Sequence, residues 1–261
     1  MRSILVQAGL DPGMTARLET GLDLARAHDS HITMLIDTPL GRFIATDGLA
    51  GGAIVATDAM QDALAADDVL AETVREQLIS QDVPFDVVRF ECEPVEAFVQ
   101  AARLADLVVV SRDCGYVGEL ALGTRIPILA LTSDAAFPTS LASVSVAWDG
   151  SDASASALRH AVPLLKAAAR VQVLTVTKPG EDFPATDALR YLARHGVKAD
   201  LVELVRKGPV EEALLKAATE CSTDLLVMGA YGHSPLREAL FGGVTRFFLN
   251  EPTAPALLLA H

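Results

Sequence analysis

Glycines in the second half of the chain have a spacing suited to holding phosphate groups. The segment Gly229-x2-Gly232-x9-Gly242 follows an apolar run at 224–228 with the composition of a buried strand. Glycine permits positive φ and lets the backbone approach a ligand closely. The last of these glycines and Gly243 open a predicted helix, and the unpaired N–H groups of a helix N-terminus attract anions. The arrangement favours a phosphate or nucleotide site over a set of ordinary turns.

The side chains around these glycines offer little reactive chemistry. Thr245 can add a hydroxyl to a phosphate oxygen, and Arg246 is either a charge for the ligand or a solvated surface residue. His233 and Ser234 are adjacent in the loop, whereas a Ser–His catalytic pair needs facing side chains and an orienting acid. The chain contains neither G-x4-G-K-[S/T] nor G-x-S-x-G, so P-loop and hydrolase chemistry are unsupported.

A repeated order of segments positions this loop. Matching pairs are 4–8 with 144–148, 31–37 with 171–177, 94–97 with 209–213, 105–110 with 223–228, and 126–131 with 254–259. Any two βαβ units share apolar strands, but the Pro-Val-Glu and X-Pro details recur in the same order as well. Alternating strands and helices predict α/β folding, with a parallel sheet in each half and helices on both faces.

The Pro-, Ser- and Thr-containing stretch 132–140 predicts a boundary between domains 1–138 and 139–261. In the second domain the predicted strands lie near 143–148, 171–176, 197–205, 224–228 and 255–260, and the predicted helices near 152–169, 184–195, 209–221 and 244–251. The first domain has an extra stretch at 38–57, then a long acidic helix near 58–80. Its fourth and fifth strands are joined only by 112–125, where the second domain uses 229–253.

The glycine loop resembles the G-x2-G-x9-G-[S/T] nucleotide motif of the universal stress proteins. Residues 146–151 resemble that family's first strand and its Asp-Gly-Ser turn, and the two halves together resemble a tandem universal stress protein. The resemblance implies a five-stranded parallel sheet in each half, with strand order 3-2-1-4-5. It also implies edge-to-edge pairing of the last strands, which would make the chain a pseudo-dimer. Whether the whole chain also forms a homodimer stays open.

The resemblance further implies a site for ATP or another adenine nucleotide, with Mg²⁺ as an optional companion. Asp149 would contact the adenine end, Val176 would line the adenine pocket, Gly229 and Gly232 would wrap the ribose and phosphates, and Gly242, Gly243, Val244 and Thr245 would cradle the phosphates. Gly243 departs from the motif's Ser or Thr. One neutral hydrogen bond contributes about 0.5–1.5 kcal/mol, so we expect weaker binding rather than none.

The first half lacks this loop, because residues 111–118 contain two glycines but not the spacing. Asp11 sits where Asp149 sits in the repeat. We therefore expect one nucleotide site per chain, with the first half as a degenerate structural partner.

Composition limits the partners and the compartment. Net charge is −13, which disfavours nucleic acid. The three cysteines, Cys92, Cys114 and Cys221, are scattered and predict neither disulfides nor zinc. His28 and His31 have metal-compatible spacing, but no further ligand lies nearby in the sequence. With strand-sized apolar runs and no long apolar N-terminal segment, we expect a cytoplasmic protein without a membrane partner.

Three functions remain open at this stage. The first is a non-enzymatic, nucleotide-binding stress-response or regulatory protein. The second is a slow ATPase at the same loop, although no general base or Mg²⁺ carboxylate is evident. The third is a purely structural or interaction protein whose nucleotide site has decayed.

Overall fold

The computed structural model describes residues 1–39, 52–132, 137–138, 140–177, 185–206, 208–231 and 243–261. The first half contains β1 (Ser3–Gln7), α1 (Met14–His28), β2 (His31–Asp37), α3 (Gly52–Ile79), β3 (Phe85–Phe90), α4 (Pro94–Ala101), the 3-10 turn η1 (Ala102–Leu104), β4 (Leu107–Ser111), the 3-10 turn η2 (Arg112–Cys114), α5 (Val117–Gly123) and β5 (Ile128–Leu131). The second half contains β6 (Ser143–Ala147), α6 (Asp152–Ala167), β7 (Arg170–Thr177), α7 (Ala185–Arg194), β8 (Asp200–Val205), α8 (Val210–Glu220), β9 (Leu225–Gly229), α9 (Gly243–Asn250) and β10 (Ala256–Ala260).

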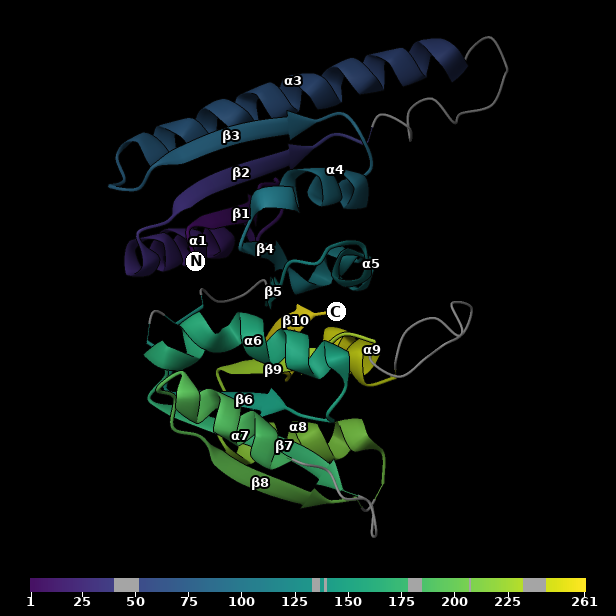
Figure 1. Ribbon diagram of the computed structural model, residues 1–261. Helices are drawn as coiled ribbons and strands as arrows, with labels where there is room; N and C mark the ends of the chain where they lie inside the picture. The colour runs from purple at the N-terminus through teal and green to yellow at the C-terminus, as the bar shows by residue number, and fades with distance from the viewer. Residues whose placement is uncertain (40–51, 133–136, 139, 178–184, 207, 232–242) are drawn as a thin grey trace.

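The described strands form one sheet in the order β3-β2-β1-β4-β5-β10-β9-β6-β7-β8. Each half is parallel and has the expected order 3-2-1-4-5, so the predicted α/β fold is confirmed. The halves meet where β5 and β10 pair antiparallel, with Leu258 opposite Leu129. Figure 1 shows β5 and β10 side by side at the centre of the molecule.

Apolar strands place two hydrophobic layers on the sheet. Every residue of β4 and β5 is buried, as parallel strands covered on both faces require. Helices α1, α3, α6 and α7 contribute buried residues to one layer, which we call cluster one. Helices α4, α5, α8 and α9 contribute to the other, cluster two. Helices from both halves therefore cover each face of the sheet.

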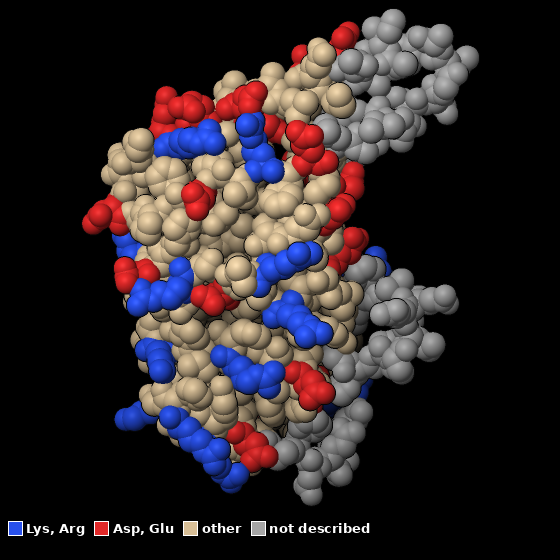
Figure 2. Space-filling view, turned by 45° about the horizontal axis from the view of Figure 1, so that its top comes forward, with Lys and Arg blue, Asp and Glu red and all other residues tan. Residues whose placement is uncertain are grey.

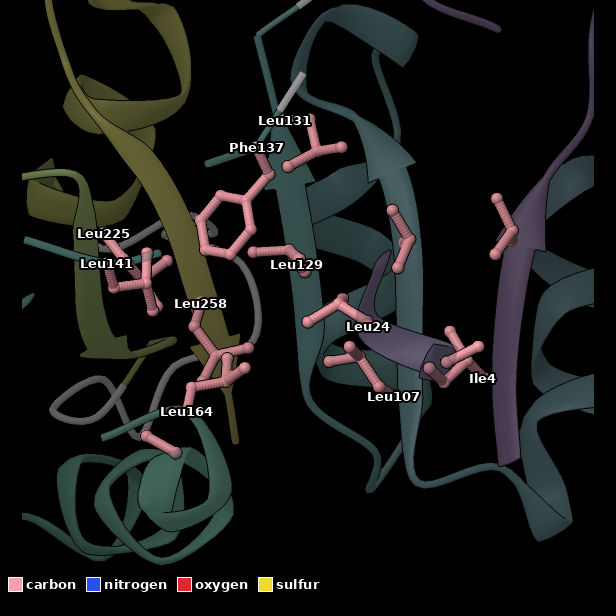
Figure 3. Packing of buried hydrophobic residues seen from close by; sticks show 14 of the residues in the cluster. Ile4, Leu24, Leu107, Leu129, Leu131, Phe137, Leu141, Leu164, Leu225 and Leu258 are labelled. Atoms are coloured by element: carbon pink, nitrogen blue, oxygen red, sulfur yellow. The ribbon is translucent and has the colours of Figure 1, made fainter. Parts of the chain in front are cut away.

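The linker contributes to cluster one. Phe137 and Leu141 are buried, and the Phe137 backbone N–H donates to Thr20 Oγ1 in α1 over 3.1 Å. Figure 3 shows Phe137 between the leucines of β5 and β10, next to Leu129 and Leu258. Residue 139 lies outside the described residues, and the boundary at 138/139 stays a prediction.

Two element boundaries differ by three residues or more from those predicted. The acidic helix begins at Gly52, before its predicted start near 58, while 40–51 lie outside the described residues. Strand β8 begins at Asp200 rather than 197, because the chain up to Val197 is still tied to the last turn of α7. Gly196 has φ 78° there, and the Val197 N–H donates back to the Leu192 carbonyl over 3.0 Å, as in a left-handed helix cap. Among the described residues no helix is long and apolar enough to cross a membrane.

Candidate functional site

The second half has a switch in strand order between β6 and β9. The chain leaves β6 for β7 on one side of it, while β9 lies on the other side. In open parallel sheets, ligands bind at such a point, beyond the carboxyl ends of the strands. The last β6–β7 pair is Ala147–Leu174, so Asp149 and Val176 both lie beyond it, and Gly229 ends β9. The fold thus brings these three predicted residues to one edge of the sheet.

Asp149 organises the turn that leads from β6 into α6. One of its carboxylate oxygens accepts from the Ser151 N–H at 3.0 Å and from the Ser151 hydroxyl at 2.6 Å. Ser151 in turn caps α6 by accepting from the Ser154 N–H at 3.1 Å. Gly150 between them has φ 73°. Asp149 itself stays exposed at the edge, in a position that the turn fixes.

Gly229 faces a helix rather than open space. A Cβ atom built on Gly229 would lie 2.6 Å from the Ser154 backbone nitrogen and 2.7 Å from the Ala153 carbonyl carbon. Real Cβ atoms do not approach backbone atoms so closely, so glycine here allows β9 to pack against the first turn of α6. The structure therefore gives Gly229 a packing role, and its contact with a ribose stays a prediction.

The chain turns sharply after β9. Ala230 is held on both sides, because its N–H donates to the Ala260 carbonyl over 2.8 Å and its carbonyl lies 2.8 Å from Nδ1 of His261. Tyr231 then adopts φ 61°, a left-handed conformation that is uncommon for a residue with a side chain. Burial, with the Glu119 carboxylate of α5 adding to it, raises the pKa of Tyr231 to about 12. Gly232 and Gly242, two of the predicted phosphate-site glycines, lie outside the described residues.

Helix α9 begins at Gly243, as the sequence predicts. Gly243 is exposed, and a Cβ atom built on it would meet no atom of the described residues within 4 Å. Val244 is half-buried against cluster two, and Thr245 is only 3% exposed. Phe248 anchors the helix in cluster two and stacks edge to face with Phe247 at 5.5 Å. The first turn of α9 is therefore open at Gly243, while contact of the Thr245 hydroxyl with a phosphate stays a prediction.

Trp148 is a candidate that the sequence reasoning missed. It is the chain's single tryptophan, it follows β6 directly, and its backbone N–H donates to the Leu174 carbonyl over 2.8 Å. Its indole Nε1 is buried and has no hydrogen-bond partner among the described residues. A buried donor without an acceptor needs an explanation such as a ligand or a bound water. The available signal was a lone tryptophan immediately before the Asp-Gly-Ser turn.

The same edge of the first half is filled by an arginine. The Arg17 side chain in α1 is completely buried. Its guanidinium donates to both carboxylate oxygens of Asp11, at 2.7 and 2.6 Å, to the Gln7 carbonyl at 2.9 Å, and to the Ser111 hydroxyl. The hydrogen bond from Arg17 holds the pKa of Asp11 below its usual value. Asp11 makes the same turn as Asp149, because it accepts the Gly13 N–H at 3.0 Å.

Further polar groups complete this cluster. Gln7 Oε1 accepts the Ser111 N–H at 3.0 Å, and Gln7 Nε2 donates to the Tyr116 hydroxyl over 2.7 Å. Burial raises the pKa of the Tyr116 phenol, and it raises the pKa of the Cys114 thiol to about 11. Since these side chains satisfy one another, this edge of the first half is a hydrogen-bonded polar cluster around the buried Arg17.

Charge is distributed unevenly between the halves. Residues 1–138 contain 9 Arg and no Lys against 21 Asp and Glu, whereas residues 139–261 contain 12 Lys and Arg against 13 Asp and Glu. Figure 2 shows acidic side chains gathered over the upper, N-terminal part and basic ones over the lower part. The repulsion of an anionic ligand expected from the net charge therefore comes mostly from the half without the glycine loop. Within the described part of the chain, no group of three or more His, Cys, Asp or Glu could hold a metal ion.

Comparisons with known proteins agree with this geometry. The model of the Universal stress protein family matches residues 142–259. One universal stress protein domain is therefore found, at residues 142–259. A universal stress protein from Synechocystis is 32% identical over 137 residues, which is 51% of this chain, and the chain spans about half (47%) of that relative's length.

Solved structures extend the fold of this domain to the whole chain. A universal stress protein from Archaeoglobus fulgidus superposes with a TM-score of 0.72 at 17% identity, covering 99% of this chain and 97% of its own. A putative universal stress protein from Pseudomonas aeruginosa gives 0.61 at 18% identity, covering 100% and 93%. Both halves thus share the architecture of universal stress proteins, while the family model itself matches only the second half. Proteins of this family are generally not enzymes, in line with the expectation of at most slow ATP hydrolysis.

Proposed function

We propose that the second half binds ATP or a related adenine nucleotide at the carboxyl edge of β6 and β9, and that the protein is a cytoplasmic stress-response or regulatory protein rather than an enzyme. The observation that carries this proposal is the open first turn of α9. No described atom lies within 4 Å of a Cβ atom built on Gly243, so the described residues leave the helix's first N–H groups approachable, and such groups favour a phosphate.

The neighbouring residues fit the rest of the ligand. Asp149 is exposed in a fixed turn, and Val176 lies half-buried at the same edge. Trp148 is partly buried, and its buried indole Nε1 is a donor that no described residue uses. Asp149, Val176 and Trp148 would position the adenine end, while Gly229, Gly232, Gly242, Gly243, Val244 and Thr245 would surround the ribose and phosphates. Mg²⁺ would reach the site with the phosphates, because no protein cluster for it is present among the described residues.

We also infer that domains 1–138 and 139–261 act as an intramolecular pseudo-dimer. The antiparallel β5–β10 ladder supports this, because it pairs the last strand of each half and leaves neither as an exposed apolar edge. Arg17 and its partners support one nucleotide site per chain, because they fill the edge of the first half. Association of two whole chains would have to use another surface.

The test is to identify any nucleotide that copurifies, then to titrate stripped protein with ATP, ADP and AMP by calorimetry and by Trp148 fluorescence. We expect one site per chain. Gly243→Asp should abolish binding without unfolding the protein, because an acidic residue suits a helix N-terminus but repels phosphate. Gly208→Asp, before α8, is the matched control and should bind normally. No binding at millimolar nucleotide would refute the proposal and leave a structural role. Steady turnover that Gly243→Asp removes would instead favour a slow ATPase.

A further inference from the structure

An arginine of the first half donates hydrogen bonds to the turn that follows helix α9. Arg112 lies in η2, directly after β4. Its Nη1 donates to the Ala254 carbonyl at 2.9 Å and to the Pro255 carbonyl at 3.4 Å, and its Nη2 donates to the Pro252 carbonyl at 3.4 Å. All three acceptors belong to the short connection between α9 and β10 in the second half. Burial lowers the pKa of Arg112, while the nearby carboxylates of Asp113 and Glu251 oppose that shift.

The chemistry of Arg112 suits this end of α9. The C-terminus of a helix is its negative pole, and α9 has no basic residue in its own last turn. Arg112 supplies that positive charge from the other half of the chain. A guanidinium also presents several donors in a rigid plane, so it fixes the direction of the carbonyls as well as their charge. Both η2 and α5 of the first half also contact α9.

We propose that Arg112 is a positioning residue for the nucleotide site, so that the half without a site sets the affinity of the half that has one. Helix α9 has eight residues, about 12 Å, and runs from Gly243 at the phosphate end to the turn held by Arg112. A helix this short transmits a displacement of one end directly to the other. This inference rests on the proposed function, because it assigns Arg112 to the same site.

A general role in holding the halves together is the competing explanation. The two explanations can be tested separately, because the relevant contacts lie on opposite faces of the sheet. Arg112 acts on α9, which packs in cluster two, whereas Phe137 joins the halves within cluster one. Phe137→Ala should therefore weaken the contact between halves without touching α9, and it is the matched control.

The experiment compares wild type, Arg112→Met, Arg112→Lys and Phe137→Ala in two measurements. The first is hydrogen exchange of the backbone amides of 243–250 without nucleotide. The second is calorimetric titration with Mg-ATP. We expect Arg112→Met to speed exchange in α9 and to weaken ATP binding about fivefold, within the usual range of coupling between sites. Arg112→Lys, which keeps the charge but loses the planar fork, should fall between the two. Phe137→Ala should lower overall stability with ATP affinity within about twofold of wild type.

The outcomes distinguish the two proposals. Equal ATP affinity in wild type and Arg112→Met overturns the role of Arg112 while the nucleotide site stands. The role of Arg112 is equally overturned if exchange in α9 is unchanged, or if Phe137→Ala weakens binding as much as Arg112→Met. A wild-type protein that binds no nucleotide overturns the proposed function, and with it this inference. Linkage adds a reciprocal check, because ATP should slow exchange in 243–250 more in wild type than in Arg112→Met.

Discussion

The two halves have the same strand order and nearly the same Asp-containing turn, yet the edges of their sheets are filled differently. Ser111 and Gly229 each lie two residues beyond the strand residue paired with Val6 or Val146. Ser111 accepts a hydrogen bond from Arg17, whereas Gly229 carries no side chain. Four residues after the N-cap, the first half has Arg17 in α1 and the second half has Ala155 in α6. The polar groups of the first half thus bind one another, whereas the second half has Gly229 and Ala155 at the matching positions, and neither carries a polar side chain.

The glycines at the contact between strand and helix also differ between the halves. In the first half, a Cβ atom on Gly13 of the turn before α1 would lie 2.7 Å from the Ser111 hydroxyl. In the second half, a Cβ atom on Gly229 of the strand would lie 2.6 Å from the Ser154 nitrogen of α6. One glycine makes room in each half, but it lies on opposite sides of the contact. Similar folds therefore do not imply similar sites, and a glycine pattern must be interpreted together with its neighbours.

Among the changes that test the difference between the halves, replacing Arg17 should have the largest effect on stability. Arg17→Met removes the guanidinium that joins Asp11, Gln7 and Ser111, so we expect the free energy of unfolding to fall by about 3 kcal/mol. Denaturant titration measures it. Arg103→Met, at an exposed position of the same half, should change stability by less than about 0.5 kcal/mol. Equal effects of the two variants would show that the buried cluster contributes nothing special.

Gly229 allows the corresponding test in the second half. Gly229→Ala forces β9 and the first turn of α6 apart, at a cost of about 2 kcal/mol of unfolding free energy. Gly243→Ala is the matched control, because a Cβ atom there meets no atom within 4 Å in the part of the chain that the structure describes. If both variants had wild-type stability in thermal and denaturant unfolding, the close packing of Gly229 would be wrong.

The repeat and the alternation of strands and helices were sufficient to predict an α/β fold with a parallel sheet in each half, and the resemblance to universal stress proteins implied the strand order. The strands β4 and β9 are apolar and each follows an Asp, so both are recognisable without coordinates, and so is a glycine at the start of α9. The role of Gly229 was not, because the sequence does not say whether a glycine faces a ligand or a helix. Arg17 escaped notice for a related reason. A lone arginine in a helix is usually solvated, and only the fold brings Asp11, Gln7 and Ser111 around it.

Acid should remove the stabilisation that the Asp11–Arg17 pair gives to the first half. Arg17 lowers the folded-state pKa of Asp11 below the ordinary value of 3.8, so their pair stabilises the fold above that pH and the contribution is lost as pH falls below it. Asp11→Asn should cost about 1.5 kcal/mol at neutral pH, less than a fully buried pair because the Asp11 side chain is 42% exposed. Denaturant titrations of both proteins from pH 7 to about pH 3 should show the difference shrinking. A difference that grows toward low pH would contradict this assignment.

The smallest predicted effect concerns the nucleotide site itself. Gly243→Ser restores the hydroxyl that the family motif has after its last glycine, at a position where space is available. One added hydrogen bond contributes about 0.5–1.5 kcal/mol, so ATP should bind about 2–10-fold more tightly. Gly243→Ala adds the same Cβ atom without the hydroxyl, and calorimetry of the two variants separates the hydrogen bond from any change in helix stability. Equal tightening by alanine and serine would mean that a firmer first turn of α9, rather than a missing hydroxyl, limits the affinity of this half.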